Sequence, residues 1–367
     1  MGNCSSPGAA RALDQSPEDD DDAVVETSLL AMGLLGASTG ARRTVLCSAP
    51  GGGGAADPGR PKGVLQAGDP LDPASSGIGW ACLAGAKPNS RYAHTNQDSW
   101  SVHRVSGHLS VYGVYDGHGR RGHEVSEAAK ASLPADLLKQ GDVSIRQAPA
   151  LMRAAFERAQ ERVGKEGFSQ RSGTTATVVL HDHRQDWLMV AHVGDSGAVL
   201  GRAVGSKMEA VQLTRDHKPE LDDERQRIRE SGGLVLADGR GSFRVYRSDS
   251  RGPGLNMSRS LGDLQGHDLC GLSAEPEILD LALGSADKVL LIGSDGLWDA
   301  VSPQEAVRTA LRMGPRCARE AAQKIAREAR QRWVLEGNYV DDITVLLIHL
   351  HTGDSAQDSA QGCPAAS

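Results

Sequence analysis

The sequence predicts an α+β fold in which antiparallel sheets are covered by helices, and three observations support this prediction. Short runs rich in Val, Leu and Ile recur through the middle of the chain and are separated by glycine, as is typical of strands joined by hairpins. Three longer segments instead carry apolar residues on one face at the helical period. Small and polar residues replace both patterns at the two ends of the chain. A folded domain with unstructured flanks is therefore expected.

The predicted elements can be assigned along the chain. Strands are expected at 100–102, 109–115, 174–180, 187–193, 198–202, 288–292 and 343–350. Helices are expected at 149–163, 303–313 and 318–333. In the first helix, Met152, Phe156 and Ala159 share one face, and Pro149 suits its first turn. The charged run at 222–225 predicts a solvated helical face within a variable flap at 221–254, and 247–254 is interpreted as an insertion.

Composition sets the boundaries of the domain. Residues 1–76 are rich in Gly, Ala, Ser, Pro and Asp, which bury too little apolar surface to offset the entropy of ordering. This leader is predicted to be mostly disordered, as is the tail at 353–367. The folded domain is expected at 77–352. A monomer is expected.

Charge and cysteine usage restrict the location and the partners. The net charge of -7 argues against nucleic acid as a partner, because nucleic-acid sites need clustered Lys and Arg. None of the six cysteines forms a Cys-x-x-Cys pair, so free thiols in a reducing cytosol are expected. No signal peptide and no apolar run of roughly 20 residues is visible. A cytoplasmic protein is predicted.

The first six residues fit one targeting pattern. In Met-Gly-Asn-Cys-Ser-Ser, Gly2 is placed for myristoylation after removal of the initiator Met, and Cys4 is placed for palmitoylation. Two acyl chains together would give stable membrane association, whereas one binds only marginally. The alternative is a chance match in a disordered leader. Membrane association through acylation therefore stands beside the cytoplasmic location as an expectation.

Acidic residues recur at the ends of predicted strands. They are Asp116 after 111–115, Asp195 after 188–193, Asp295 and Asp299 after 289–292, and Asp341 before the last strand. An Asp-Gly pair after a strand is ordinary turn chemistry when it occurs once. Four such clusters instead predict carboxylates that converge and need cations to offset their repulsion. Oxygen ligands without cysteine favour Mg²⁺ or Mn²⁺.

This chemistry points to hydrolysis of a phosphoester. Two divalent ions that share a carboxylate activate a bridging water for in-line attack on phosphorus. His118 lies two residues after Asp116, and an imidazole with an ordinary pKa of about 6.5 suits a general acid for the leaving alkoxide. The alternative role of His118 is that of a surface or packing residue. We favour the catalytic role.

The chain resembles the protein phosphatase 2C family of metal-dependent serine/threonine phosphatases over residues 77–352. Nine family-like motifs occur in the expected order. They are Asn-Gln-Asp-Ser at 96–99, Val-Tyr-Asp-Gly-His-Gly at 114–119, Ser-Gly-Thr-Thr-Ala at 172–176, His-Val-Gly-Asp-Ser at 192–196, Leu-Thr-Arg-Asp-His-Lys-Pro at 213–219, Ser-Arg-Ser-Leu-Gly-Asp at 258–263, Ser-Ala-Glu-Pro-Glu at 273–277, Ser-Asp-Gly-Leu-Trp-Asp at 294–299 and Asp-Asp-Ile-Thr at 341–344.

The resemblance implies a four-layer α/β/β/α sandwich with two central antiparallel sheets flanked by helices. It also implies roles for individual residues. By this resemblance Asp116 bridges two Mg²⁺ or Mn²⁺ ions, the Gly117 carbonyl binds one of them, and Asp295 and Asp341 complete the other. The resemblance further implies that Asp98 orders a metal-bound water and that His118 is the general acid. It also implies a weaker third metal site, formed by Asp195 and Asp299 together with Asp295. The motifs at 215–218 and 259–263 are expected to be structural.

Two positions depart from the family pattern. Gln97 replaces an acidic residue of the metal's outer shell, and Ala93 occupies the position of a phosphate-binding arginine. Lys87 or Arg91 are the candidates to bind substrate phosphate instead, with His94 as a further option. A lysine ammonium does not reproduce the bidentate fork of arginine, so phosphate affinity is the least secure property that the resemblance implies.

The predicted function is hydrolysis of phosphoserine and phosphothreonine in phosphoprotein substrates by a metal-bridging hydroxide, without a covalent phosphoenzyme. The alternative is a catalytically inactive relative that acts as a binding or regulatory module anchored at a membrane, which Gln97 and Ala93 would explain. A nuclease-like metallohydrolase is disfavoured by the acidic net charge.

Overall fold

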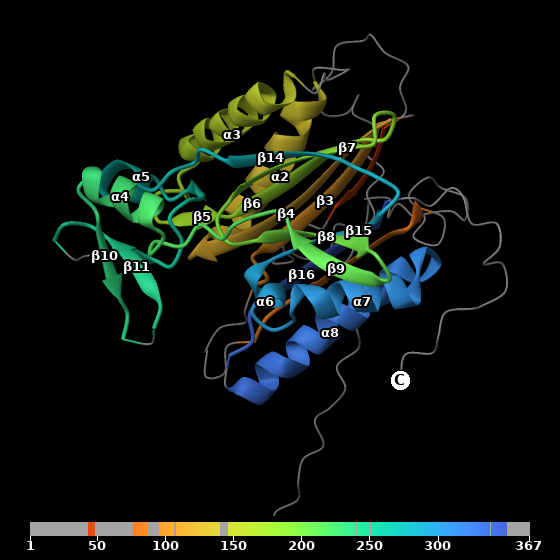
Figure 1. Cartoon of the computed structure of the whole chain (residues 1–367). Coiled ribbons are helices and arrows are strands. Elements are labelled where there is room, and N and C mark those ends of the chain that lie inside the picture. The colour runs from red at the N-terminus through yellow and green to blue at the C-terminus, as the bar shows by residue number, and fades with distance from the viewer. Residues whose placement is uncertain are drawn as a thin grey trace, which may run out of the picture.

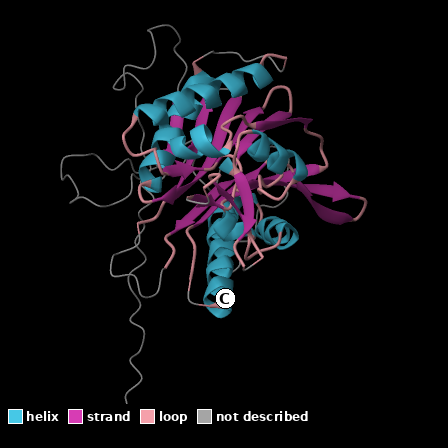
Figure 2. Cartoon of the chain, turned by 90° about the vertical axis from the view of Figure 1, so that its left-hand side faces the viewer, coloured by secondary structure: helices cyan, strands magenta, loops and turns pink. Residues whose placement is uncertain are grey.

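The computed structural model describes residues 43–47, 76–86, 95–105, 108–139, 146–239, 241–249, 252–337 and 339–350. Two antiparallel sheets pack face to face in the centre of the molecule, and helices cover both outer faces (Figure 1). This is the predicted four-layer α/β/β/α arrangement, and the prediction is confirmed. Figure 2 shows the strands of both sheets between the two helical layers.

The larger sheet has eight strands, and the main path follows the order β1-β3-β4-β6-β7-β14. Its strands are β1 (Arg43–Cys47), β3 (Asp98–Val105), β4 (Leu109–Gly119), β5 (Ser172–Thr174), β6 (Ala176–Asp182), β7 (Trp187–Val193), β13 (Leu261–Gly262) and β14 (Glu277–Ala282). The outer face is covered by α2 (Gly122–Leu138) and α3 (Ala148–Lys165). Their apolar residues, such as Leu133 and Phe156, pack on Val178 and Met189 of the sheet.

The smaller sheet has the order β2-β16-β15-β8-β9. Its strands are β2 (Ile78–Leu83), β8 (Gly197–Val204), β9 (Lys207–Gln212), β15 (Asp287–Gly293) and β16 (Ile343–His349). The helical layer on this side consists of α6 (Asp295–Trp298), α7 (Pro303–Met313), the 3-10 turn η2 (Pro315–Cys317) and α8 (Ala318–Glu336). A third apolar cluster, which includes Trp80, Trp100 and Leu290, fills the space between the two sheets.

A small subdomain projects from one end of the sandwich (Figure 1). It contains α4 (Asp222–Glu230), β10 (Leu234–Ala237), β11 (Phe243–Tyr246), β12 (Pro253–Leu255) and α5 (Leu264–Cys270). The three strands form a separate sheet whose apolar residues pack with Ile228 and Cys270. We refer to residues 222–255 as the flap. The predicted charged helix is present in it, and the predicted insertion at 247–254 leads into β12.

Three expectations need correction. Strand β1 lies within the leader that was predicted to be mostly disordered, because backbone pairing with β3 orders these five residues. Helix α2 was not predicted, since its buried face mixes apolar residues with polar ones such as Lys130 and Asp136. Cys317 is disulfide-bonded, whereas Cys82 and Cys270 are not part of a disulfide. Sequence spacing did not reveal this bond because bridging depends on proximity in space.

Candidate active site

A pair of carboxylates lies across two neighbouring strands of the larger sheet. Asp98 opens β3 and Asp116 lies in β4, and the two residues are direct cross-strand partners. The sequence placed Asp116 after the end of its strand, but β4 continues because residues 117–119 pair with β5. Gly117 is required here, since a Cβ would lie 2.4 Å from the carbonyl oxygen of Gly122. Backbone therefore approaches the site directly beside Asp116.

The other acidic residues arrive from the smaller sheet and from the turn between the sheets. Asp295 begins α6 two residues after β15, and Asp299 ends that short helix. Asp341 precedes β16, and Asp195 lies in the turn that joins β7 to β8. Ser294 Oγ donates to Asp98 Oδ2 at 2.8 Å, so the end of β15 meets the start of β3.

Electrostatic coupling shows that these carboxylates converge. Burial raises the pKa of Asp116 well above its ordinary value, and the charges of Asp98 and Asp295 raise it further. Burial likewise raises the pKa of Asp295, followed by the charges of Asp195 and Asp341. Each carboxylate is therefore unfavourable in its ionised form unless a cation lies among them.

The donor chemistry of the cluster fits divalent ions. Asp98 Oδ1 and Asp195 Oδ1 are buried and have no hydrogen-bond partner among the residues that the structure describes. Carboxylate oxygens of this kind suit Mg²⁺ or Mn²⁺. Within the described part of the chain, however, no three Asp, Glu, His or Cys side chains form a ready ligand shell. Two oxygens are engaged elsewhere, since Asp195 Oδ2 lies 2.5 Å from Lys218 Nζ and Asp341 Oδ1 lies 2.8 Å from the Tyr339 hydroxyl.

Gln97 and Asp342 brace the backbone around Asp98. Asp342 accepts hydrogen bonds from the backbone N–H groups of Gly85, at 2.7 Å, and Gln97, at 2.8 Å. The Gln97 amide donates to the carbonyl oxygen of Gly119 at 2.9 Å, which a glutamate could not do while ionised. Gln97 therefore fixes the end of β4. Asp342 differs in role from the adjacent Asp341, a distinction that the sequence motif did not reveal.

His118 is held by a carboxylate that sequence analysis treated as structural. Its Nε2 lies 2.6 Å from Asp263 Oδ2, and Ser260 Oγ donates to the same oxygen at 2.7 Å. Burial opposes protonation of His118, but the charge and hydrogen bond of Asp263 outweigh burial and raise the pKa of His118. The His118 Nδ1 atom is buried and has no hydrogen-bond partner. A proton on Nδ1 is therefore available for transfer.

Lys218 is a second residue whose role was missed. Its ammonium is half-buried and contacts Asp195, whose side chain is 1% exposed. Burial lowers the pKa of Lys218, but the charge and hydrogen bond of Asp195 raise it by more. The ammonium therefore partly neutralises the predicted third ion site. The motif at 213–219 carried the signal, but sequence spacing does not show which carboxylate the lysine reaches.

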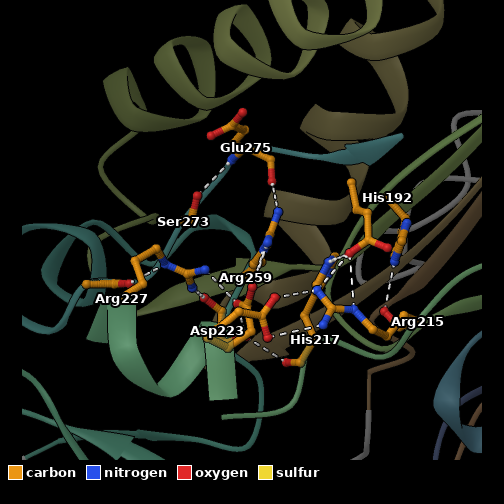
Figure 3. A network of polar contacts seen from close by, with 12 residues as sticks. His192, Arg215, His217, Asp223, Arg227, Arg259, Ser273 and Glu275 are labelled. Carbon is orange, nitrogen blue, oxygen red and sulfur yellow. Dashed lines mark hydrogen bonds and ion pairs between the residues drawn. The ribbon is translucent and has the colours of Figure 1, made fainter. Parts of the chain in front are cut away.

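A polar network joins the flap to the larger sheet (Figure 3). Glu224 on α4 is fully buried and pairs with Arg259 at 2.6 Å and with Arg227 at 2.7 Å. It also accepts a hydrogen bond from Ser258 Oγ. Arg215 bridges Asp223 and Glu277 at 2.8 and 2.9 Å near the surface. The prediction that the charged run is a solvated face was therefore wrong for Glu224, because Arg259, which lies outside α4, compensates its charge together with Arg227 of the same helix.

The same network reaches the turn that carries Asp195. The His217 ring stacks on His192 with a centroid distance of 4.4 Å. His217 also exchanges two hydrogen bonds with Gly194: its backbone N–H donates to the Gly194 carbonyl, and its Nδ1 accepts from the Gly194 N–H. Its carbonyl oxygen accepts from the Ser258 N–H at 2.8 Å. His217 therefore connects the flap anchor to the residue before Asp195.

Several predicted residues lie outside the described part of the chain. They are the phosphate-binding candidates Lys87 and Arg91, the neighbouring Ala93 and His94, and the acylation sites Gly2 and Cys4. Their roles stay predictions. The carboxylates at 98, 116, 195, 295, 299 and 341, together with His118, all belong to the site described above.

Comparisons with known proteins agree with this arrangement. The family model for protein phosphatase 2C matches residues 77–334. A probable protein phosphatase 2C 48 from Oryza sativa subsp. japonica is 36% identical over 66% of this chain and 76% of its own length. A probable protein phosphatase 2C 34 from Arabidopsis thaliana is 32% identical over 71% of this chain and 78% of its own length.

A solved structure shares the fold. The crystal structure of a serine-threonine phosphatase 2C from Toxoplasma gondii aligns with a TM-score of 0.63 at 20% identity and covers 74% of this chain and 94% of its own. The match to the family model extends over more than half of the sequence, and the sandwich and its acidic cluster are the features expected of that family. The chain therefore belongs to the protein phosphatase 2C family of serine/threonine protein phosphatases.

Proposed function

We propose that this protein hydrolyses phosphoserine and phosphothreonine in proteins by direct attack of water on phosphorus, with no covalent phosphoenzyme. The observation that carries the proposal is the cluster of buried carboxylates contributed by both sheets. Such a cluster lowers the stability of the fold unless divalent cations are present, so its natural role is to bind them. Two bound Mg²⁺ or Mn²⁺ ions would neutralise the carboxylates and the phosphoryl oxygens and supply a water of lowered pKa.

Each residue of the site would have a distinct role in this reaction. Asp116 would bridge the two ions, with the Gly117 carbonyl on one side and Asp295 and Asp341 on the other. Asp98 would accept a hydrogen bond from the attacking water, and this role is supported by its Oδ1, which has no partner in the described part of the chain. Asp195 and Asp299 would hold a weaker third ion beside Asp295.

His118 would protonate the leaving alkoxide. Asp263 occupies Nε2, so the proton to be transferred is the one on Nδ1. A serine or threonine alkoxide is a poor leaving group, and a positioned acid typically contributes about 10²- to 10⁴-fold to such a reaction. The Cys270 thiol is a poor competing nucleophile, since it is fully buried and burial raises its pKa.

The test is hydrolysis of a phosphothreonine peptide by purified full-length protein in Mn²⁺, Mg²⁺ or EDTA. Asp116→Asn and Asp295→Asn are the matched charge-removal variants, and Asp280→Asn, an exposed aspartate on β14, is the control. Activity that requires metal and both site aspartates supports the proposal. Single turnover in ¹⁸O-water should place one ¹⁸O in the released phosphate, without a trapped phosphoprotein. A folded protein with no activity in any metal would favour the inactive binding module.

We also propose that Gly2 and Cys4 are acylated and bring the phosphatase to a membrane. No helix in the described ranges is long and apolar enough to cross a bilayer. Acyl chains on Gly2 and Cys4 would supply the membrane affinity. The test is fractionation of cells that express the wild type, Gly2→Ala or Cys4→Ser. Membrane association that persists in Gly2→Ala would contradict the proposal.

A further inference from the structure

A groove of about 180 Å³ lies between α7 and α8, on the outer face of the smaller sheet. Val301 and Ile325 are buried and line it, and Thr309 adds a hydroxyl. Arg308, Arg312 and Lys324 line it as well. Figure 1 shows the two helices side by side, on the far side of the molecule from α2 and α3. None of the carboxylates of the site lines this groove.

The charges of the groove are not balanced. Its two acidic residues, Glu305 and Glu328, both pair with Arg332, at 3.1 and 3.0 Å. Arg308, Arg312 and Lys324 form no ion pair with any residue that the structure describes, and both arginines are exposed. Four cationic and two anionic side chains therefore line the groove, and three cations are available to a ligand.

The sequence holds an acidic segment that complements this surface. Residues 303–336, which form the helical layer, contain eight Lys and Arg against four Glu, although the whole chain has a net charge of -7. Residues 1–42 contain seven Asp and Glu against two Arg. Five of these acidic residues form the continuous run Glu-Asp-Asp-Asp-Asp at 18–22.

We propose that the acidic run at 18–22 docks in the groove between α7 and α8 of the same molecule. Twenty residues, 23–42, separate the run from β1. Extended, they span at most about 70 Å, which exceeds the roughly 50 Å diameter of a domain of this size. The linker is therefore longer than any straight-line distance between β1 and a point on the surface of the domain.

Tethering makes the contact effective even though each ion pair is weak. Exposed ion pairs are individually weak because water and salt screen them, so the run would bind poorly as a separate peptide. A segment of the same chain is instead present at an effective concentration in the millimolar range. Because the cations are exposed, the contact should weaken when the Debye length falls from about 10 Å at 0.1 M salt to about 3 Å at 1 M.

The experiment is photo-crosslinking within the full-length protein. A benzophenone amino acid replaces Thr309, which lines the groove and carries no charge. After irradiation and trypsin digestion, we expect a crosslink to the peptide of residues 12–42, which contains the whole run and ends at Arg42. The yield should fall about tenfold in 1 M NaCl and in a variant whose five acidic residues are replaced by Asn and Gln.

Matched charge reversals test the groove itself. Arg308→Glu with Arg312→Glu should abolish the crosslink, and changing the run to five lysines should restore a crosslink to this segment, read after chymotrypsin digestion because trypsin would cut at the new lysines. Arg316→Glu with Arg327→Glu is the control, because both arginines are exposed in the same layer but lie outside the groove. Phosphatase activity of each variant reports that it has folded.

Three outcomes would overturn the proposal. One is the absence of a crosslink to 12–42, and another is a yield that does not change in the neutral-run variant. The third is a crosslink between a ¹⁵N-labelled and an unlabelled molecule when the two proteins are mixed. Such a crosslink would show that a second copy of the protein fills the groove. The readout is a peptide mass, so failure of this proposal is distinguishable from failure of the proposed catalytic function.

Discussion

Replacing Glu224 with Gln should destabilise the flap, whereas the same change at the neighbouring Asp223 should not. Both residues lie in the first turn of α4 and both contact arginine. Glu224 is fully buried and pairs with Arg259, whose side chain is 15% exposed, so the substitution leaves a largely buried guanidinium without its counter-charge. Asp223 and Arg215 are instead 56% and 42% exposed.

The burial of each ion pair determines how much free energy of unfolding we expect its loss to cost. Breaking a buried ion pair by removing one partner costs about 3–5 kcal/mol, and the residual exposure of Arg259 and Arg227 argues for ~3 kcal/mol at Glu224. An exposed pair contributes ~0–1 kcal/mol, so Asp223→Asn should change the free energy of unfolding by less than about 1 kcal/mol. The expected difference between these neighbouring substitutions is therefore ~2 kcal/mol or more.

Urea titration followed by circular dichroism measures the two free energies of unfolding. Hydrogen exchange then locates the loss, which we expect in α4 and in β10 to β12, because Glu224 links the flap to Ser258 and Arg259. Equal losses in the two variants would refute the reasoning. So would a loss at Glu224→Gln of less than 1 kcal/mol, since the buried guanidinium would then have found another partner.

Three further predictions concern residues that the sequence did not single out. Asp263→Asn should slow hydrolysis of phosphothreonine peptides by about 10- to 100-fold but affect an aryl phosphate less, because a good leaving group needs no proton from His118; equal losses on both substrates would contradict this. Burial lowers the pKa of His349 to about 4, below its unfolded value of 6.5, so the unfolded state takes up the proton first. Stability should therefore be lost as pH falls from 6.5 toward 4, by ~2 kcal/mol at pH 5, and His349→Asn should flatten this slope in urea titrations at pH 7 and pH 5. Lys218→Met should tighten binding of Mn²⁺ at Asp195 by about tenfold or more, measured by paramagnetic resonance of free Mn²⁺, and unchanged affinity would show that the ammonium does not compete.

Much of the sandwich could be predicted from sequence because its strands and helices keep a clear period. The run at 187–193 matches β7 and the run at 303–313 matches α7, since each buries a continuous apolar face. Helix α2 was not predicted because its buried side includes the charged residues Lys130 and Asp136, and Asp136 is compensated by Arg162, which is distant in sequence. Strand β1 was not predicted from the sequence, because its order depends on its pairing with β3.

The acidic residues of the site were predictable, but the residues that orient them were not. Asp116 and Asp295 follow apolar runs of sequence and carry a local signal. Asp263 and Lys218 lie in motifs that do not reveal their contacts, because their partners, His118 and Asp195, lie 145 and 23 positions away. Whether a family-like polar motif is structural or part of the site depends on such contacts, which form only when the chain folds.

The placement of the carboxylates links ion binding to the packing of the two sheets. Asp98 and Asp116 belong to the larger sheet, whereas Asp295 and Asp341 follow or precede strands of the smaller one. Repulsion among these charges therefore acts across the interface between the sheets and tends to separate them at this end. Apolar contacts such as that of Trp80 with Trp100, whose ring centroids lie 5.1 Å apart, oppose the separation. Because a cation bound among the carboxylates would remove the repulsion, we expect ion binding to stabilise the packing of the two sheets at this end.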